Sequence, residues 1–235
     1  MPGRPLIGVL GGMGPLATVD FLHKLISLSP ARRDQDHVPT VVWNVPQIPD
    51  RQKAIAGNGP SPVPAMREGI ERLNSAGATV IVIPCNTAHI WYDDLQAVSG
   101  APILHIADAT LAALPADIGT VGLIATEGTL NSDLYQARFR ARGIGFVTQT
   151  PSDIAERFVP GCYAIKQNDL QRGGELLEAC GQDLLDRGAD RLVLACTEVP
   201  VGLEFIKSLL LPLCVDPAQA LATACLRYWS DENAR

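Results

Sequence analysis

The chain has 235 residues, a length that fits one or two domains. Its hydrophobic content of 47% and charged content of 19% are those of a folded globular protein and exclude a disordered chain. A net charge of −6, only 5% aromatic residues and no basic cluster argue against a nucleic-acid partner. The longest apolar run, residues 209–215, is too short to span a bilayer, and the N-terminus lacks the apolar stretch of a signal peptide. We therefore expect a cytoplasmic protein with no membrane partner.

Short apolar segments alternate along the chain with segments of helical periodicity, which is the βαβα pattern of a parallel sheet. The predicted fold class is therefore α/β, with a doubly wound arrangement in each half. In chain order, we predict strands at residues 6–10, 40–45, 79–84, 103–105, 120–125, 145–148 and 191–195. We predict helices between and after them at residues 15–28, 63–76, 87–98, 107–114, 132–142, 170–187 and 217–229.

Residues 46–62, between the second strand and the next helix, form a long segment without periodicity. Structureless loops beyond about 12–15 residues are usually lids or binding loops. This one follows the carboxyl end of a strand, where open α/β sheets place ligands. It contains Arg51, and a second cation, Lys166, lies between helical patterns in the second half. Both can pair with a substrate carboxylate, and a solvated surface position is the alternative for each.

The two halves of the chain resemble each other. Residues 80–87 parallel residues 192–197, and the strand with Gly8 parallels the strand with Gly122. A cysteine follows the glycine by 77 residues in the first half (85 − 8) and by 74 in the second (196 − 122), which indicates a duplicated unit of about 75 residues. Two such lobes facing each other would place the two cysteine-bearing strand ends across one cleft.

A glycine-rich turn, Gly12-Met13-Gly14, follows the first strand and opens a helix, so it loosely fits the dinucleotide fingerprint G-x-G-x-x-A. That fingerprint needs an acidic residue at the end of the second strand, and this strand has none. We therefore do not expect a dinucleotide cofactor. Unpaired amides at the start of the helix would suit a carboxylate instead.

Cys85 and Cys196 each lie between a predicted strand and a predicted helix. Asn86 or Thr87 is a candidate N-cap after the first. The helix dipole is expected to lower the pKa of a thiol at this place, although a buried structural cysteine is the alternative for either site alone. Inversion of a stereocentre without a cofactor needs one group to remove the α-proton and a second to return a proton on the opposite face. Two matched thiols suit that reaction, and the developing negative charge would be stabilised by the polar groups of Asn86, Thr87, Thr126 and Thr197.

Six cysteines are spread along the chain without a C-x-x-C pair, so zinc-ribbon, thioredoxin and disulfide-scaffold frameworks are excluded. Cys180 and Cys225 lie in helical patterns and Cys214 in an apolar run, so we expect all three in the core, whereas Cys162 is undecided. His89 stands four residues after one of the matched cysteines. A Cys–His dyad or a metal pair is therefore open, although we expect neither, and no bound metal.

At these residues the sequence resembles the aspartate/glutamate racemase family, the cofactor-independent amino-acid racemases of the aspartate racemase type. The likeness spans nearly the whole chain in order. It is carried by residues 7–15, Pro49-Asp50-Arg51, residues 84–89, residues 125–129, Ile165-Lys166 and residues 196–200.

The resemblance implies two similar doubly wound α/β lobes related by pseudo-twofold symmetry, with the active site in the cleft between them. The first lobe is predicted at residues 1–101, with 212–235 packing back on it, and the second at 102–211. The resemblance also implies an isomerase that needs no pyridoxal phosphate or other cofactor, and a homodimer. The expected catalytic residues are Cys85 and Cys196, and the expected substrate-binding residues are Met13, Arg51, Asn86, Thr87, Thr126, Lys166 and Thr197.

Glu198 stands where glutamate racemases usually have histidine, which favours the aspartate branch; we expect it beside the Cys196 thiol and out of contact with substrate. The predicted function is therefore interconversion of L- and D-aspartate or glutamate by two thiols. Three alternatives stay open: a broad-specificity racemase of other amino acids, a one-thiol decarboxylase, isomerase or hydrolase, and a catalytically silent amino-acid-binding protein.

Overall fold

The computed structural model describes residues 5–233 of the chain. The chain forms two compact units, one of Met1–Ala109 with Ala218–Arg235 and one of Thr110–Pro217, and each is described here by itself. The first change of unit falls inside helix α5 (Ile106–Ala113). The boundaries predicted at residues 101 and 211 lie eight and six residues earlier (109 − 101 and 217 − 211).

The first unit is built on a three-stranded parallel sheet in the order β2-β1-β3. Its strands are β1 (Ile7–Gly11), β2 (Thr40–Asn44) and β3 (Val80–Val82). The strand predicted at 103–105 is reduced to a single bridge between Ile103 and Ile81. Its pairing is short because Pro102, which precedes it, has no N–H to extend the ladder.

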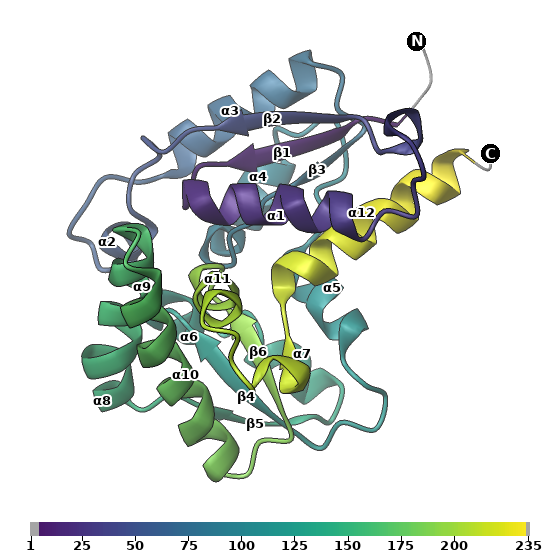
Figure 1. The fold of residues 1–235 in the computed structure, drawn as a ribbon. Coiled ribbons are helices and arrows are strands. Elements are labelled where there is room, and N and C mark those ends of the chain that lie inside the picture. The colour runs from purple at the N-terminus through teal and green to yellow at the C-terminus, as the bar shows by residue number, and fades with distance from the viewer. Residues whose placement is uncertain (1–4, 234–235) are drawn as a thin grey trace. The chain divides into compact units, whose positions relative to one another are not determined.

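Strand residues of the first unit point alternately to two apolar clusters, so both faces of the sheet are covered. Ile7 and Val9 belong to one cluster, and Leu10 belongs to the other. Helices α1 (Pro15–Ser27) and α12 (Pro217–Asn233) cover the first face, and α3 (Val63–Ser75) with α4 (Tyr92–Gln96) covers the second (Figure 1). This is a doubly wound arrangement.

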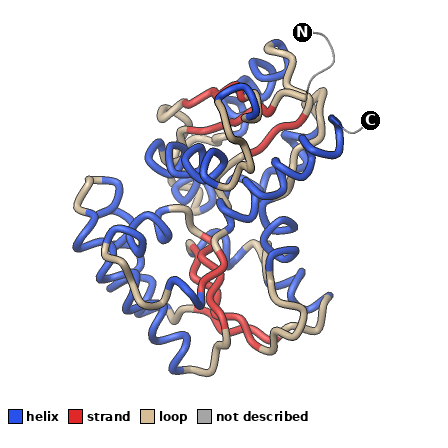
Figure 2. The backbone as a smooth tube through the Cα atoms, turned by 45° about the vertical axis from the view of Figure 1, so that its right-hand side comes forward, coloured by secondary structure: helices blue, strands red, loops and turns tan. Residues whose placement is uncertain are grey.

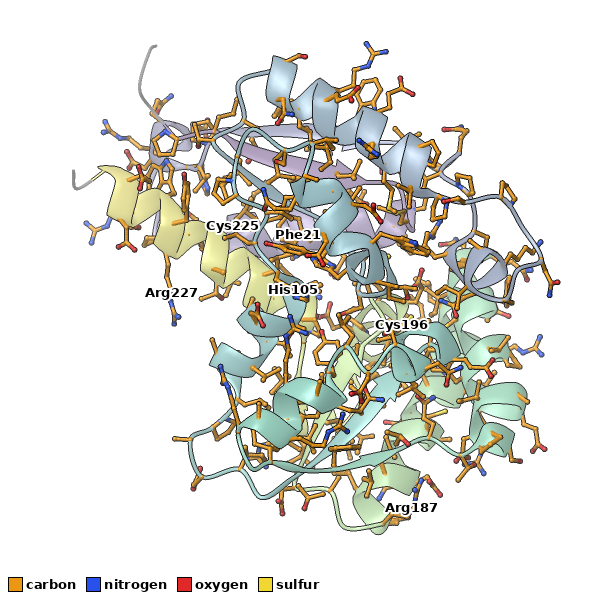
Figure 3. All side chains as sticks on the ribbon, turned by 180° about the vertical axis from the view of Figure 1, so that it is seen from behind. Phe21, His105, Arg187, Cys196, Cys225 and Arg227 are labelled. Atoms are coloured by element: carbon orange, nitrogen blue, oxygen red, sulfur yellow. The ribbon has the colours of Figure 1, made fainter. Side chains whose placement is uncertain are left out.

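The last helix of the chain is part of the first unit. Cys225 of α12 and Phe21 of α1 are fully buried in the same cluster and lie close to each other in Figure 3. The hydroxyl of Tyr228 donates a hydrogen bond of 3.0 Å to the carbonyl of Thr79, just before β3. The packing of α12 therefore combines apolar burial with a polar contact to the sheet.

The second unit has a four-stranded parallel sheet in the order β5-β4-β6-β7. Figure 2 shows the strands in red with helices on both sides. Cys180 and Leu192 belong to an apolar cluster on the face covered by α9, α10 and α11, and the ring of Phe139 of α7 packs at a tilt against that of Phe146 of β5. The bounds are β4 (Thr120–Ala125), β5 (Gly145–Thr148), β6 (Arg191–Ala195), β7 (Cys214–Val215), α6 (Glu127–Asn131), α7 (Gln136–Ala141), α8 (Pro151–Asp153), α9 (Val159–Lys166), α10 (Leu170–Asp186) and α11 (Glu198–Phe205).

The two units repeat one packing motif around a glycine in the central strand. Gly8 pairs with Ile81, and Gly122 pairs with Leu192. A Cβ atom on Gly8 would lie 2.8 Å from the Cβ of Ala78, and one on Gly122 would lie 2.8 Å from Leu192 Cδ2, so a side chain larger than hydrogen fits at neither position. The residues around the two glycines correspond at a constant offset of 111: Leu73 and Leu184, Ala78 and Ala189, Ile81 and Leu192. The same offset relates Cys85 to Cys196.

Several predicted elements need correction. The loop predicted at 46–62 contains a helix, α2 (Arg51–Ile55), and the helix predicted at 87–98 is a 3₁₀ segment, η2 (Thr87–Trp91), followed by α4. The helix predicted at 132–142 begins only at Gln136 (α7), because Asp133 has a φ of 60°, outside the helical region. A continuous helical run over residues 151–166, made of α8, a π-helical turn η3 (Ile154–Phe158) and α9, was not predicted, since it contains two prolines and a glycine. No helix among the described residues is both long enough and apolar enough to cross a bilayer.

Candidate active site

Cys85 lies three residues beyond β3, in a tight turn. Its N–H donates a hydrogen bond of 2.7 Å to the carbonyl of Ile83, and its side chain is only 6% exposed. Asn86 is the N-cap residue of η2, but its side chain makes no capping bond there. The predicted placement of this thiol between a strand and a helix is correct, except that the helix begins as a 3₁₀ turn.

His89 fixes the backbone of this turn. Its Nδ1 lies 2.9 Å from the carbonyl oxygen of Cys85, and its Nε2 accepts a hydrogen bond of 3.2 Å from the N–H of Ile106. Because Nε2 is an acceptor, the ring proton is on Nδ1, which donates to Cys85, and the imidazole is neutral. Both nitrogens are thus bonded to the backbone, which argues against the Cys–His dyad and the metal pair. The described residues also contain no group of three or more acidic, cysteine or histidine side chains arranged to hold a metal.

The helix α2 connects the long segment after β2 to the Cys85 turn. Asp50 caps this helix by accepting hydrogen bonds from the N–H groups of Gln52 and Lys53, at 2.8 and 3.0 Å. The side chain of Gln52 then donates a bond of 3.3 Å to the hydroxyl of Thr87. The sequence analysis missed Gln52, and the signal that could have found it is the Asp50 cap, which starts a helix inside the predicted loop.

Arg51 is the first residue of α2 and is half-buried. Its Nη1 donates to the carbonyls of Ile48 and Pro49, at 3.1 and 2.9 Å. Ile48 is buried in the same apolar cluster as Cys85. The guanidinium is therefore held by the turn that precedes the helix, and this turn is anchored in the core beside the thiol.

The glycine-rich turn after β1 differs from its prediction in one respect. The N–H of Gly12 is not unpaired, because it donates a hydrogen bond of 3.0 Å to the hydroxyl of Thr18, which in turn donates to the carbonyl of Gly14. A Cβ on Gly12, whose φ is +94°, would lie 2.3 Å from the backbone of Val45, so only glycine fits. Met13 is buried, 3% exposed, in the apolar cluster that includes Cys85.

Cys196 follows β6 directly, and Thr197 is the N-cap residue of α11. The Cys196 thiol donates a hydrogen bond of 3.1 Å to Oε2 of Glu198. The sulfur of Cys162, on α9, lies 3.8 Å from the Cys196 sulfur. The side chains of Cys162, Cys196, Thr197 and Glu198 are all buried, so the contacts of the thiol with Cys162 and Glu198 are shielded from solvent.

This environment reverses the predicted effect on the Cys196 thiol. Its pKa is raised well above the ordinary value by the hydrogen bond with Cys162, by burial and by the adjacent charge of Glu198. The dipole of α11 was expected to lower the pKa, but burial and a carboxylate in contact with the sulfur outweigh a partial charge at a helix end. Cys196 therefore rests as a neutral thiol.

Lys166 is the last residue of α9, rather than part of a segment between helices as predicted. Its Nζ lies 3.8 Å from Oε1 of Glu198 and 5.5 Å from the ring centre of Tyr163. The lysine side chain is 43% exposed, whereas the Glu198 side chain is 9% exposed. The cation thus stands at the solvent side of a row that continues through Glu198 to the Cys196 thiol.

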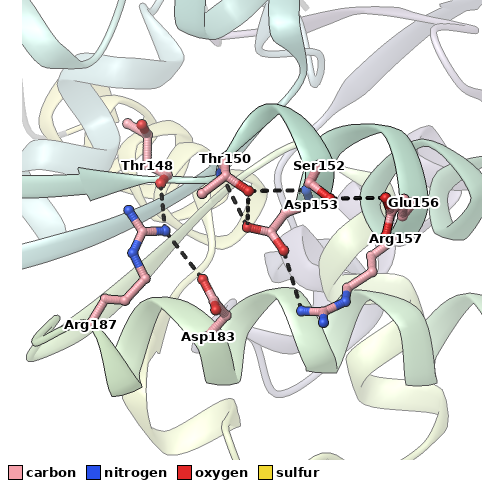
Figure 4. A network of polar contacts seen from close by, with 8 residues as sticks. All are labelled: Thr148, Thr150, Ser152, Asp153, Glu156, Arg157, Asp183 and Arg187. Atoms are coloured by element: carbon pink, nitrogen blue, oxygen red, sulfur yellow. Dashed lines mark hydrogen bonds and ion pairs between the residues drawn. The ribbon is translucent and has the colours of Figure 1, made fainter.

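A polar network holds the start of the helical run that carries Cys162 and Lys166 (Figure 4). Thr150 and Asp153 form a capping box, and Asp153 also pairs with Arg157. The hydrogen bond from the Thr150 hydroxyl is the main reason that the pKa of Asp153 is lowered. Arg187 of the following helical segment bonds to the Thr148 carbonyl and to Asp183.

Thr126 caps α6 at the end of β4. Its hydroxyl accepts a bond of 3.2 Å from the N–H of Thr129 and donates one of 2.9 Å to the Thr129 hydroxyl. Cys180 and Cys225 are buried core residues, as predicted, whereas Cys214 is only half-buried against the core of the second unit. Burial is the main reason that the pKa values of all three thiols are raised to about 12. Among the predicted site residues, the first unit thus brings together Cys85, Asn86 and Thr87, and the second brings together Lys166, Cys196, Thr197 and Glu198.

The comparisons with known proteins agree on one family. The family described as Asp/Glu/Hydantoin racemase matches residues 10–225. The structure of an aspartate racemase from Picrophilus torridus is similar with a TM-score of 0.85 and 34% identity, over 96% of this chain and 94% of that one. A broad-specificity amino-acid racemase of Bacillus subtilis, RacX, is 28% identical over 208 residues, which are 86% of this chain and 89% of the relative.

A more distant structure shares the fold. A glutamate racemase from Francisella tularensis, in complex with D-glutamate, superposes with a TM-score of 0.72 at 20% identity, over 99% of this chain and 83% of that one. The predicted α/β fold class and the predicted family resemblance are therefore confirmed. The chain belongs to the Asp/Glu/Hydantoin racemase family.

Proposed function

We propose that this racemase interconverts the L and D forms of aspartate or glutamate, without a cofactor, by proton transfers at Cys85 and Cys196. The observation that carries the proposal is the repetition of a strand–Cys–helix turn at matching places in two units whose first three strands are arranged in the same order. The similarity to an aspartate racemase over 96% of the chain supports the substrate class.

In the proposed mechanism one cysteine acts as a thiolate and removes the α-proton, while the other acts as a thiol and donates a proton to the opposite face. Cys196 rests as a thiol because its pKa is raised by Cys162, by burial and by Glu198, so it is prepared for the donating role. In the reverse direction Cys196 must lose its proton. Oε2 of Glu198, which accepts the thiol hydrogen bond at 3.1 Å, is the group placed to take it.

Removal of the α-proton shifts negative charge onto the α-carboxylate of the substrate. Hydroxyl and amide donors that are already oriented stabilise such charge more than mobile water does. Thr87 is held by Gln52, and Thr126 by Thr129, so both hydroxyls have fixed positions. We assign these residues, with Asn86 and Thr197, to the substrate carboxylate.

The side-chain carboxylate of the substrate requires a cation. Arg51 and Lys166 are assigned to it, and the peptide turn at Met13 to the wall of the site. The Lys166 side chain is 43% exposed, so a substrate carboxylate can reach its head group from the solvent side. Nη1 of Arg51 donates to backbone carbonyls, and the other guanidinium nitrogens can donate to the substrate carboxylate.

Hydrogen–deuterium exchange at the α-carbon tests this function. Each enantiomer of a panel of amino acids is incubated with the protein in D₂O, and exchange and inversion are followed by NMR and chiral chromatography. We expect exchange with inversion for aspartate or glutamate. Absence of exchange with both acids would refute the substrate assignment, and efficient exchange of neutral amino acids would favour a broad-specificity racemase, an alternative supported by the similarity to RacX.

Substitution of the two cations separates the substrate class from the chemistry. Arg51→Ala and Lys166→Met should raise the KM for acidic substrates roughly tenfold to 100-fold, the range for loss of a charged hydrogen bond of about 1.5–3 kcal/mol. The exposed Lys53→Met on the same helix as Arg51 is the matched control. If both variants keep the preference for acidic substrates, Arg51 and Lys166 do not bind the substrate and are ordinary solvated surface residues.

We also propose that the protein works in the cytoplasm as a homodimer and without nucleic-acid or membrane partners. The net charge of −6 supports the lack of affinity for nucleic acid. Sedimentation at micromolar concentration tests the oligomeric state, and a monomer that retains full activity would refute the dimer.

A further inference from the structure

Cys162 is a buried thiol that the proposed mechanism does not use. Its sulfur lies 3.8 Å from the sulfur of Cys196, and the two residues are 7% and 6% exposed. Cys162 belongs to α9 and Cys196 to the turn between β6 and α11, so two separate elements bring the sulfurs together. Both are free thiols in this structure.

We propose that Cys162 and Cys196 form a redox modification site, at which a peroxide joins them in a reversible disulfide that removes the Cys196 thiol from catalysis. The loss of activity rests on the proposed function, whereas formation of the disulfide does not.

The reaction is a two-electron oxidation in two steps. One thiolate attacks the O–O bond of hydrogen peroxide, so that an S–O bond forms, the O–O bond breaks and the released hydroxide takes up a proton to give water. The second sulfur then attacks the sulfenic sulfur. The S–S bond forms, the S–O bond breaks, and the hydroxyl leaves as water with the proton of the second thiol. In sum, two thiols and one peroxide give one disulfide and two waters.

The geometry of the pair is favourable for the second step. A disulfide bond is about 2.05 Å long, so the two sulfurs have to approach each other by about 1.8 Å. The Cys196 thiol already donates to Oε2 of Glu198 at 3.1 Å, and this carboxylate can take the proton when the sulfur reacts. The acceptor that we assign to catalysis therefore also assists the oxidation.

The neighbouring thiol changes the outcome of oxidation at Cys196. A cysteine without a partner proceeds from sulfenic to sulfinic and sulfonic acids, which thiols do not reduce, whereas a disulfide is reduced by thiols. Cys162 thus replaces irreversible oxidation of the Cys196 sulfur by a disulfide that is inactive but reducible.

Cys180 provides an internal control. It is buried in the same apolar cluster and interacts electrostatically with Cys162, but burial raises its pKa to about 12. What distinguishes the Cys162–Cys196 pair is its geometry, with 3.8 Å between the two sulfurs and a carboxylate at 3.1 Å to accept the thiol proton of Cys196, so we expect Cys180 to stay reduced. A pairing of Cys162 with Cys180 is the competing connection.

The test treats the full chain with hydrogen peroxide, alkylates the remaining thiols and maps the peptides by mass spectrometry without reduction. We expect a peptide pair joined through Cys162 and Cys196, loss of racemase activity in proportion to the joined fraction, and recovery of both with dithiothreitol. Cys180→Ala should behave as the parent protein does. In Cys162→Ala, and in the more conservative Cys162→Ser, we expect a loss of activity that dithiothreitol does not restore, with sulfinic or sulfonic acid at Cys196.

The proposal is overturned by a Cys162–Cys180 pair, by a disulfide between copies of the chain, or by oxidation of Cys196 to its acids in the parent protein without any joined peptide. The peptide map decides this even for a protein that proves inactive with every amino acid. Failure of the proposed function is then seen separately, as an absence of α-proton exchange in the fully reduced protein.

Discussion

The turns at Cys85 and Cys196 occupy corresponding positions in the two units, but their side chains differ. At the constant offset of 111 residues, Asn86 corresponds to Thr197, Thr87 to Glu198 and His89 to Pro200. In the first turn His89 lies 2.9 Å from the carbonyl oxygen of the cysteine, and Gln52 donates to the Thr87 hydroxyl at 3.3 Å. In the second turn a carboxylate at 3.1 Å and a second thiol at 3.8 Å contact the cysteine sulfur.

Under the proposed two-thiol mechanism, this difference gives the two acid–base groups distinct surroundings. A two-base reaction on mirror-image substrates needs similar placement of two thiols but opposite protonation states at any moment. The shared scaffold of glycine-packed parallel strands provides the placement, and residues two and four positions after each cysteine provide the chemical difference. Substitutions that remove or exchange these residues therefore test the comparison.

Removing either thiol should have the largest effect. Cys85→Ala and Cys196→Ala should each reduce racemisation roughly 10³-fold or more, since a positioned acid–base group contributes about 10²–10⁴-fold. The remaining thiol can still take a proton from the enantiomer that it faces. Each variant should therefore exchange the α-proton of one enantiomer in D₂O with retention, and the two variants should select opposite enantiomers. Full racemisation by either one would disprove the two-thiol mechanism.

Glu198→Gln should have the next largest effect, and it should act on the Cys196 thiol and not on Cys85. It removes a carboxylate that raises the pKa of Cys196, so that pKa should fall, and the limb of the pH–rate profile that belongs to Cys196 should move to lower pH. We expect kcat/KM to fall roughly tenfold to 100-fold, below the contribution of a thiol itself. L and D substrates have equal free energies, so the fall in kcat/KM must be the same in both directions.

The control for this prediction is Glu204→Gln, which removes the same charge from an exposed position of the same helix. Its pH profile should match that of the parent protein. If Glu198→Gln also leaves the profile in place, Glu198 does not act on the Cys196 thiol.

His89→Phe should affect the Cys85 turn through its backbone. The ring volume is kept, but the carbonyl of Cys85 and the N–H of Ile106 lose their partner, which costs about 1–3 kcal/mol for each buried group left unpaired. We expect lower stability to urea and a fall in kcat without a shift of the limb assigned to Cys196. The matched variant Pro200→Ala should have little effect on kcat. Equal losses in the two variants would show that the comparison between the turns is wrong.

Most of the fold could be predicted from the sequence because its strands are nearly continuous apolar runs ended by turn residues. The runs at 120–125, 145–148 and 191–195 coincide with β4, β5 and β6. Helices made by capping and not by periodicity were missed: α2 depends on the Asp50 side chain, and the run from α8 depends on the Thr150 capping box. Such contacts involve a few residues and leave no periodic pattern.

The candidate site could be predicted in part. Local spacing located Cys85 and Cys196 at strand ends, and Lys166 was selected as a cation that could pair with a substrate carboxylate. The contact of Cys162 with Cys196 joins residues 34 apart in sequence, and the hydrogen bond between Gln52 and Thr87 joins residues 35 apart. Contacts of this kind depend on tertiary packing. For the same reason the sign of the Cys196 pKa shift could not be derived from its helix end alone.

The smallest effects should come from the two glycines, where the comparison predicts equality. In Gly8→Ala the new methyl group meets Ala78 at 2.8 Å, and in Gly122→Ala it meets Leu192 at 2.8 Å and Leu184 at 2.9 Å. Each crowding should lower the free energy of unfolding by about 1–3 kcal/mol, as overpacked cores do, while kcat changes less than in the preceding variants. Urea denaturation followed by circular dichroism measures the loss, and Gly57→Ala, at a turn with open space but a φ of +73°, separates crowding from backbone strain. A loss at Gly8 without one at Gly122 would mean that only the first unit depends on close strand–helix packing, and the correspondence between the units would then be limited to their topology.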